Sequence, residues 1–195
     1  GVDWKKIEQG GKSWVSPFGS NLALTLGFKI DADISSLQGL SLALAVELQE
    51  CLNEFCSIDL GFKWPNDIYL NNKKLCGILV EVGGDFSGTF NLVLGIGLNL
   101  TKSNQFNSIE QPFICLEEAG FIIDKNLLAA RLAIRIEKML PEFLTKGFAA
   151  WQEKWNKQHL WYGKQAVLIN GANKKQVEIK EVNSHGELMV INEDG

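Results

Sequence analysis

Apolar residues in the first part of the chain recur with two different periods, and each period predicts one kind of element. Residues 21–28 (NLALTLGF) are apolar, compatible with a strand and preceded by a turn-rich segment, so we expect a buried β-strand there. From Ser35 or Ser36, either of which can cap a helix, leucines recur at helical spacing up to about Leu52. The pattern therefore predicts a buried strand followed by a core-facing helix.

A series of strand-like runs comes next, at residues 58–63, 67–70, 74–82 and 90–100. Asn71 and Asn72 form a turn signal between the second and third runs. A glycine-rich turn at 83–88 precedes the last run. These runs predict an antiparallel meander with one buried face.

The pattern in the second half of the chain predicts one long helix followed by a series of short strands. After a polar loop at 102–111, Asp124 is a plausible N-cap for an amphipathic helix through Leu127, Ile134 and Met139. Pro141 should kink or split that helix. Beyond Trp161 the strand-like pieces 165–169, 176–182 and 187–191 resemble the start of a small β-barrel. We therefore expect one domain over 1–160 and a partial β domain over 161–195.

Composition narrows the class of protein. A chain of 195 residues that is 46% hydrophobic can bury one sizeable core. A net charge of −4 with scattered Lys and Arg lacks the footprint of a nucleic-acid binder. No apolar stretch is long enough for a membrane span and no signal pattern opens the chain. The cysteines show no C-x-x-C pairing and lie in apolar runs, which predicts buried free thiols in a reducing compartment, the cytoplasm; they are Cys51, Cys56, Cys76 and Cys115.

The chemical signal is concentrated in three short motifs. They are K-W-P-N-D at 63–67, K-K-L-C-G-I-L-V-E at 73–81 and G-I-G-L-N at 95–99. W-x-S-P-F-G-x-N-L at 14–22 and L-E-E-A-G at 116–120 extend the pattern on either side. In this order and spacing the elements resemble the biotin protein ligase family, closely over residues 12–160 and more loosely in the terminal β segment.

The resemblance implies a fold and an activity. The fold is α+β, a class II aminoacyl-tRNA synthetase-like (biotin/lipoate ligase) catalytic domain with a small C-terminal SH3-like β-barrel. The activity is ATP-dependent conversion of biotin to biotinyl-5′-AMP and transfer of biotin to one lysine of the biotin carboxyl carrier domain of acetyl-CoA carboxylase. ATP, Mg²⁺ and biotin are then the ligands. A homodimer formed through the exposed edge of the meander is a further possibility.

Lys74 is the residue that we expect to be central to catalysis. Biotin's carboxylate must attack the α-phosphate of ATP although both groups are anionic, so fixed positive charge is needed where they meet. A lysine on a strand opposite a turn supplies a compact ammonium, which we expect to contact biotin as well. Without the neighbouring K-W-P-N-D motif, an ordinary exposed strand lysine would be the better interpretation.

Asn66 and Asp67 directly precede a strand, and Pro65 fixes the backbone that presents them. They are candidates for contact with the nucleotide, with phosphate or with the Mg²⁺ that accompanies ATP, which we place near Asp67 without a direct protein metal site. The competing interpretation is a Pro-Asn-Asp turn stabilised by an Asx hydrogen bond.

Gly77, Gly95 and Gly97 lie inside predicted strands, where glycine is unfavourable unless a ligand or another backbone comes close. The resemblance implies that these strands border the biotin pocket and that Trp14 covers it. β-Bulging or tight sheet packing is the alternative for each glycine.

The resemblance also completes the expected nucleotide site. It implies an adenine hydrogen bond for Asn99 and an aromatic contact with adenine for Phe113, although a buried core phenylalanine competes with the second role. It adds Lys12 to the nucleotide-binding residues.

One departure from the family concerns residues 7–13. Biotin protein ligases carry a G-R-G-R-x-G-R loop before the tryptophan, whereas here the stretch I-E-Q-G-G-K-S has no arginine. Either the protein is a diverged or inactive relative, or the natural protein has loop residues that this sequence omits, and we favour omission because the rest of the site is intact. Two other classes of function compete with a biotin protein ligase, namely a lipoate or octanoate ligase or transferase, which would share the fold and the lysine, and a non-catalytic biotin-binding relative, which would lack the basic loop. The chain has no P-loop, so ATP use follows from the resemblance alone. His159 and His185 lack partners at metal or relay spacing, and we assign them no role in chemistry.

Overall fold

The computed structural model describes residues 8–9, 12–13, 20–84, 89–102, 112–170 and 173–192, with side chains from Ser20 onward except at residues 170 and 173. The two-residue strands β1 (Glu8–Gln9) and β2 (Lys12–Ser13) pair with each other. The predictions for Trp14, and those for the side chains at 7–13, lie outside the described residues.

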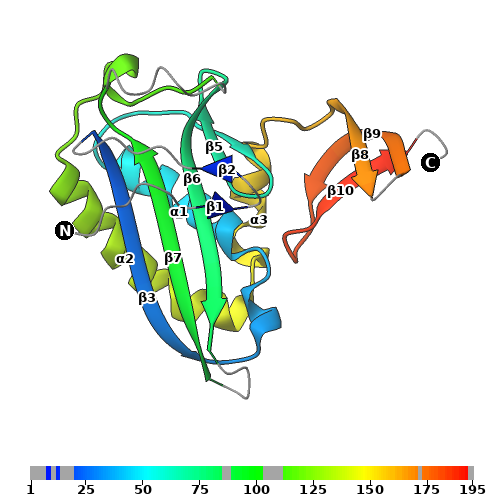
Figure 1. Cartoon of the computed structure of the whole chain (residues 1–195), viewed down its shortest axis with the longest axis horizontal. Coiled ribbons are helices and arrows are strands. Elements are labelled where there is room, and N and C mark those ends of the chain that lie inside the picture. Colours follow the sequence, from blue (N-terminus) through cyan, green and yellow to red (C-terminus); the bar gives the residue numbers. More distant parts are fainter. Residues whose placement is uncertain are drawn as a thin grey trace.

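A five-stranded antiparallel sheet forms the centre of the molecule, in the order β3-β7-β6-β5-β4 (Figure 1). Its strands are β3 (Asn21–Asp31), β4 (Gly61–Lys63), β5 (Asp67–Leu70), β6 (Lys73–Gly83) and β7 (Thr89–Asn99). Consecutive strands from β4 to β7 are neighbours, so the predicted meander is confirmed. Strand β3 lies outside β7, where the structure shows it as an edge strand.

The strand predicted at 21–28 is present within β3, but it is buried on one face only. Ala23, Thr25 and Gly27 are exposed, while the alternating residues Leu24 and Leu26 pack against the core. Alternate residues of a strand point to opposite faces, and the described helices pack on only one face of β3. We call the face of the five-stranded sheet that lies opposite the helices the open face.

Strand β4 is also shorter than the predicted 58–63. Residues Ile58 and Leu60 are buried but precede the strand. The amide side chain of Gln49 donates to the Ile58 carbonyl at 2.7 Å and accepts from the Leu60 amide at 3.0 Å. A side chain thus replaces the ladder hydrogen bonds that a longer strand would have made.

The helix predicted from Ser35 or Ser36 begins later. A short 3-10 helix, η1 (Ile34–Leu37), is capped by the Asp33 carboxylate, which accepts from the Ser35 amide at 2.8 Å. The helix α1 (Leu40–Asn53) starts after Gly39, whose φ of 78° is left-handed. This backbone conformation suits glycine and separates the two helices, so neither serine caps α1.

Helix α2 (Lys125–Lys146) begins as predicted, because Asp124 accepts a hydrogen bond from the Leu127 amide at 2.9 Å. It runs on past Pro141, so of the predicted kink or split the split does not occur, and the helix ends at Lys146 before α3 (Ala149–Lys157). Two residues of the predicted apolar face, Leu127 and Ile134, are exposed. The buried face of α2 consists of Leu128, Leu132, Ile136, Met139, Leu140 and Phe143.

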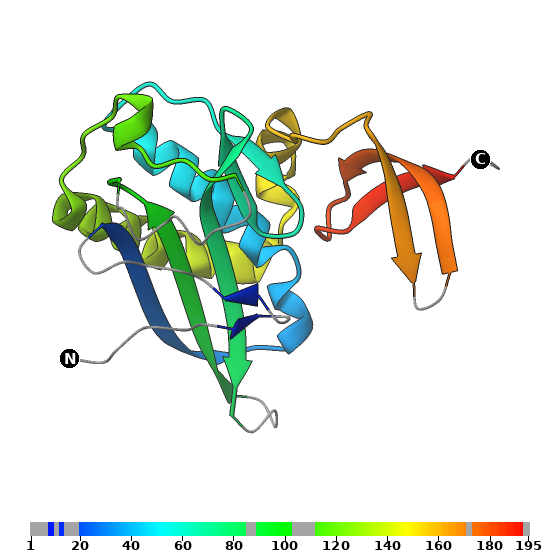
Figure 2. The ribbon, with the colours of Figure 1, turned by 45° about the horizontal axis from the view of Figure 1, so that its top comes forward.

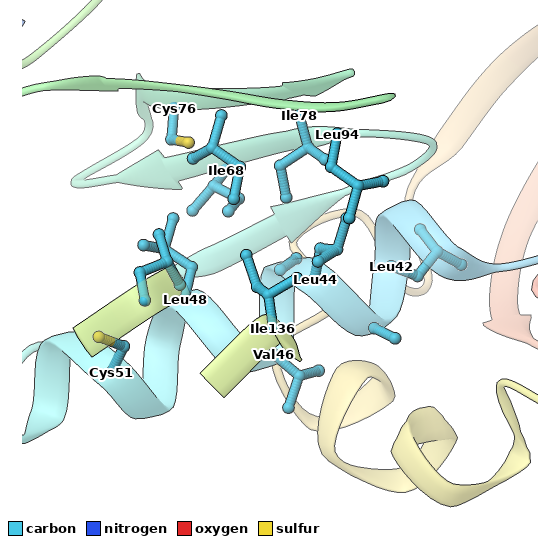
Figure 3. Packing of buried hydrophobic residues seen from close by; sticks show 14 of the residues in the cluster. Leu42, Leu44, Val46, Leu48, Cys51, Ile68, Cys76, Ile78, Leu94 and Ile136 are labelled. Atoms are coloured by element: carbon cyan, nitrogen blue, oxygen red, sulfur yellow. The ribbon is translucent and has the colours of Figure 1, made fainter. Parts of the chain in front are cut away.

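The core lies between the helices and one face of the sheet. Figure 3 shows Leu44 and Leu48 of α1 directed towards Ile68 and Ile78 of the sheet, with Ile136 of α2 beside them. All five side chains are almost fully buried. Burying such side chains is the dominant favourable term in folding, and it fixes the sheet against α1 and α2.

A three-stranded antiparallel sheet of order β10-β9-β8 follows α3 and lies to one side of the larger sheet (Figure 2). Its strands are β8 (Gln165–Asn170), β9 (Asn173–Val182) and β10 (Leu188–Asn192). Side chains of α3 attach it to the rest of the chain, because Asn156 accepts from the Val182 amide at 2.8 Å and donates to its carbonyl at 3.0 Å. The described residues thus confirm a small C-terminal sheet.

All the cysteines are free thiols, as predicted, and only Cys56 is partly exposed. Burial raises the pKa of each thiol, that of Cys51 to about 11. Reactive thiolates are therefore scarce at neutral pH. No helix in the described part of the chain is long and apolar enough to cross a membrane.

Candidate active site

A β-bulge in strand β6 directs Lys74 to the open face. Ile68 of β5 pairs with Cys76, but the next residue, Tyr69, pairs with Lys74, so Leu75 is an extra residue in β6. Leu75 and Cys76 are both fully buried in the core. Without the bulge, Lys74 would share the core face with Cys76, because residues two apart in a strand point the same way.

The ammonium of Lys74 lies 2.6 Å from the Asp67 carboxylate. Asp67 pairs in register with Gly77, which places both charged groups on the open face. The side chains are 21% and 18% exposed, respectively. The structure thus unites two predicted site residues in a partly buried ion pair.

The backbone of Lys74 also holds the segment that carries Phe113. The Lys74 amide donates to the Pro112 carbonyl at 3.1 Å, and the Ile114 amide donates to the Lys74 carbonyl at 3.0 Å. Phe113 therefore forms a parallel bridge with Lys74. Its side chain is only half-buried and is outside the hydrophobic core. The competing interpretation of a core phenylalanine is not supported.

Asn99, the last residue of β7, binds the backbone of both Lys74 and the segment that carries Phe113. Its amide nitrogen donates to the Ile114 carbonyl at 3.2 Å and to the Lys74 carbonyl at 3.5 Å. The side chain is 5% exposed. One end of the Asn99 amide is thus used to join β6, β7 and the Phe113 segment.

Asn66 is attached to β6 on the other side of the bulge. Its side-chain amide donates to the Ile78 carbonyl at 2.9 Å, and its own carbonyl accepts from the Ile78 amide at 3.0 Å. These bonds fix the backbone that leads into Asp67. The adjacent Trp64 is 39% exposed and donates to the Gly186 carbonyl at 3.0 Å, so it links the motif to the C-terminal sheet.

Small residues form a row across the open face. The row begins at Ala23 of β3, which pairs with Gly97 of β7. Gly97 also pairs with Gly77 of β6, and Gly77 pairs in turn with Asp67 of β5. Glycines in the middle of strands leave room above the sheet that side chains would otherwise fill. The row ends at the Lys74–Asp67 ion pair, so the space and the charge lie together.

Gly95 stands one step further along β7, opposite Leu79 of β6. A Cβ added to Gly95 would lie 3.3 Å from the Leu79 Cβ. Close packing within the sheet therefore contributes to the need for glycine at this position, while Gly95 still faces the same side as Gly97.

Two parts of the site were not predicted. The bulge at Leu75 has a weak signal in the sequence, namely two adjacent apolar residues where an alternating strand would have one. Asn21, which the motif at 14–22 includes without a role, pairs in register with Asn99 and is 7% exposed. A polar residue at the start of an apolar strand is the signal that points to it.

No cluster of three or more potential metal ligands occurs among the described residues. His159 is buried and packs against Trp155 with the rings tilted and their centroids 4.8 Å apart, whereas His185 lies in an exposed turn. Cys76, beneath the Lys74 bulge, has its thiol pKa raised by burial. None of these groups is placed to act as a nucleophile or as a proton relay at the Lys74 site.

Comparison with known proteins identifies relatives of this chain. The model of the biotin/lipoate A/B protein ligase family matches residues 2–99. The bifunctional ligase/repressor BirA of Escherichia coli (strain K12) is 32% identical over 186 residues, which cover 95% of this chain and 58% of that protein. The chain thus spans little more than half the length of this curated relative.

Solved structures show the same fold. The biotin protein ligase from Aquifex aeolicus in complex with biotin and ATP is 27% identical with a TM-score of 0.78, over 95% of this chain and 77% of that one. A biotin protein ligase-like protein of unknown function from Silicibacter is 12% identical with a TM-score of 0.73, over 91% and 77% of the two chains. The second likeness concerns the fold alone. The described chain has the mixed α and β architecture of the biotin protein ligase fold, the class II aminoacyl-tRNA synthetase-like type that we predicted.

Proposed function

The chain belongs to the biotin/lipoate A/B protein ligase family, and we propose that it activates biotin with ATP and passes it to one lysine of the biotin carboxyl carrier protein of acetyl-CoA carboxylase. One observation carries the proposal: the Lys74 ammonium is held 2.6 Å from Asp67 at the end of a row of small residues on the open face. Relatives that are named ligases, and a neighbour solved with biotin and ATP, support it.

In the first step, a carboxylate oxygen of biotin attacks the α-phosphorus of ATP. A new P–O bond forms, the bond to the bridging oxygen breaks, and pyrophosphate leaves with the electron pair. The Lys74 ammonium would lie between the two anions, so it would reduce their repulsion and stabilise the charge that builds up between them. The product is biotinyl-5′-AMP, a mixed anhydride.

In the second step, the neutral amine of the acceptor lysine attacks the acyl carbon of the anhydride. An amide bond forms, the acyl–O bond breaks, AMP leaves and the amine loses a proton. Water would hydrolyse the same anhydride, so the site has to hold it away from solvent until the carrier docks. Trp14, which we propose as the cover over biotin, would serve this purpose.

Asp67 and Asn66 are the residues that we assign to the phosphate side of the nucleotide. Carboxylate and amide oxygens are suitable ligands for Mg²⁺, which is usually held by one or two carboxylates together with phosphates and water. The ion would accompany the ATP phosphates and lie near Asp67, which would act on it directly or through water. When bound, Mg²⁺ neutralises part of the phosphate charge.

The remaining assignments divide the open face into two regions. Biotin's bicyclic ring would lie over Gly77, Gly95 and Gly97, because this row leaves space above the sheet. The adenine would stack on Phe113, which is half-buried and held beside Lys74. Asn99, through its amide oxygen, and Lys12 complete the proposed nucleotide site.

We also extend the proposal to the wider protein. The three-stranded terminal sheet would be part of a small SH3-like β-barrel. The homodimer edge that we predicted on the meander would instead be β3, because β7 pairs with β3 and β4 bridges His159. The net charge of −4 favours partners other than nucleic acid. The free thiols favour a cytoplasmic location.

The experiment that tests this function is pyrophosphate release from ATP by the purified chain, with biotin, with lipoate or with neither. Release that depends on biotin supports the proposal. Release that depends on lipoate would instead favour a lipoate or octanoate ligase. No release under any condition would favour a non-catalytic biotin-binding relative, the alternative raised by the missing arginines at residues 7–13.

A further inference from the structure

Asn21 is a buried amide without a hydrogen-bond partner. It is the first residue of β3 and is 7% exposed. Neither its amide nitrogen nor its amide oxygen has a partner within the part of the chain that the structure describes. Leaving such a group unpaired is unfavourable, and unpaired buried polar groups in native structures call for an explanation.

The position of Asn21 relates it to the proposed nucleotide site. It pairs in register with Asn99, so the two side chains lie next to each other on the same face of the sheet. That face is the open face, because Ala23 shares it and pairs with Gly97. The Ser20 carbonyl accepts from both the amide and the hydroxyl of Thr101, at 2.9 and 3.0 Å, which fixes this end of β3.

The two asparagines differ in what they can offer a ligand. The amide nitrogen of Asn99 is already engaged by the carbonyls of Lys74 and Ile114, so Asn99 can present only an acceptor. Adenine displays an amino donor at N6 next to a ring acceptor at N7, and an acceptor and a donor together satisfy both. One free amide side chain can supply both, but Asn99 can supply only the acceptor. The acceptor of Asn99 suits N6, and the nitrogen of Asn21 supplies the donor that N7 lacks.

We propose that Asn21 donates to the N7 atom of the adenine ring and thereby makes the site selective for adenine nucleotides. This inference rests on the proposed function, and it adds a specificity-determining residue to it. The amide atoms of Asn21 are shielded from solvent. The hydrogen bond gained then offsets the cost of the unpaired amide.

The test compares ATP with 7-deaza-ATP, which lacks the N7 acceptor, as substrates for biotin-dependent pyrophosphate release. The wild type should have a kcat/KM about 10- to 100-fold lower with 7-deaza-ATP. Asn21→Ala should lower kcat/KM for ATP by a similar factor and leave 7-deaza-ATP almost unchanged. Its thermal midpoint should not fall, because no partner is lost. Asn21→Ser keeps a smaller donor, so its kcat/KM for ATP should lie between those of the wild type and Asn21→Ala.

Asn91→Ala is the matched control, since Asn91 lies on the same face of β7 as Asn99, at the other end of the strand, and is exposed. It should leave kcat/KM unchanged with both ATP and 7-deaza-ATP. Equal losses with ATP and 7-deaza-ATP in Asn21→Ala would overturn the inference, as would a raised KM for biotin or a lowered melting midpoint with ATP kinetics unchanged. A wild type that releases no pyrophosphate would overturn the proposed function itself, whereas an active wild type with an unaffected Asn21→Ala variant would overturn only the role of Asn21.

Discussion

Lys74 and Asp67 lie 2.6 Å apart, with 21% and 18% of their side chains exposed. Such a pair is screened less than a surface pair but is still reached by solvent. An anionic ligand that enters beside Lys74 can share its ammonium with Asp67. The ion pair therefore holds the lysine in place without requiring that Lys74 be desolvated alone.

Lys74→Ala should abolish most of the adenylation rate while affecting biotin binding much less, because the ammonium matters most where carboxylate and phosphate meet. We expect kcat for biotin-dependent pyrophosphate release to fall about 100- to 1,000-fold, with biotin affinity measured by calorimetry. The neighbouring Lys73 is exposed, and Lys73→Ala serves as the control that should remain active. Wild-type turnover in Lys74→Ala would remove this residue from the mechanism.

Phe113→Ala should weaken nucleotide binding by about 1–3 kcal/mol of lost stacking and leave biotin affinity largely intact. Separate titrations with ATP and biotin measure the two effects. Phe121 is also half-buried but packs against the core, so Phe121→Ala should reduce stability without this preference for one ligand. Equal losses for ATP and biotin in Phe113→Ala would show that Phe113 does not contact adenine.

At the scale of elements, apolar periodicity predicted most strands and the order of the meander. It did not predict that Lys74 faces the site, because an unbroken alternation would have placed Lys74 with Cys76 in the core. The bulge at Leu75 reverses that direction. Pairing between strands determines a bulge, and pairing is not visible within a single strand.

In the helices too, features that depend on local sequence were predicted and features that depend on the rest of the fold were not. The Asp124 cap was predicted because its signal is local, a carboxylate three residues before the amide that it accepts from. The start of α1 was not, since it depends on the left-handed backbone at Gly39. Likewise, Leu127 and Ile134 fit an apolar stripe of α2 but are exposed, because the packing of α2 against α1 and β3 selects the buried face.

A polar cluster joins the helices behind the sheet. Glu47 of α1 is buried, and its carboxylate accepts from Trp151 of α3 at 2.8 Å and from Arg135 of α2 at 3.1 Å. Arg135 also contacts Glu50 and Glu54. The cluster thus bonds three helices through a single buried carboxylate.

Glu47→Ala should lower the free energy of unfolding by about 1–3 kcal/mol, since it leaves the Trp151 indole nitrogen unpaired and buried. Urea denaturation measures the loss. The exposed pair of Glu142 with Lys146 offers the comparison, and Glu142→Ala should cost less than about 0.5 kcal/mol. Similar losses in the two variants would contradict the importance of the buried cluster.

At the scale of the whole molecule, the edge of β4 is closed by the chain that leads to the C-terminal sheet. Phe62 donates to the Gln158 carbonyl and accepts from the Leu160 amide, at 2.7 and 2.9 Å, and bridges His159. His159 is 9% exposed. Burial lowers the pKa of His159 below its ordinary value of 6.5, so this junction prefers a neutral imidazole.

The stability of the protein should therefore fall as the pH falls through about 6.5, because the unfolded chain binds a proton on this histidine more readily than the folded chain does. His159→Gln should flatten the dependence of the free energy of unfolding on pH between about pH 8 and about pH 5. His185 lies in an exposed turn, and His185→Gln should leave that dependence as in the wild type. An unchanged slope in His159→Gln would contradict a buried neutral imidazole.

The measurement that tests the central claim most directly is the mass of a purified biotin carboxyl carrier domain after incubation with this protein, biotin, ATP and Mg²⁺. We predict the gain of one biotinyl group on one lysine, dependent on ATP and lost in Lys74→Ala. A carrier domain whose mass stays unchanged with biotin, under conditions in which the protein is folded, would contradict the assignment of this site to protein biotinylation.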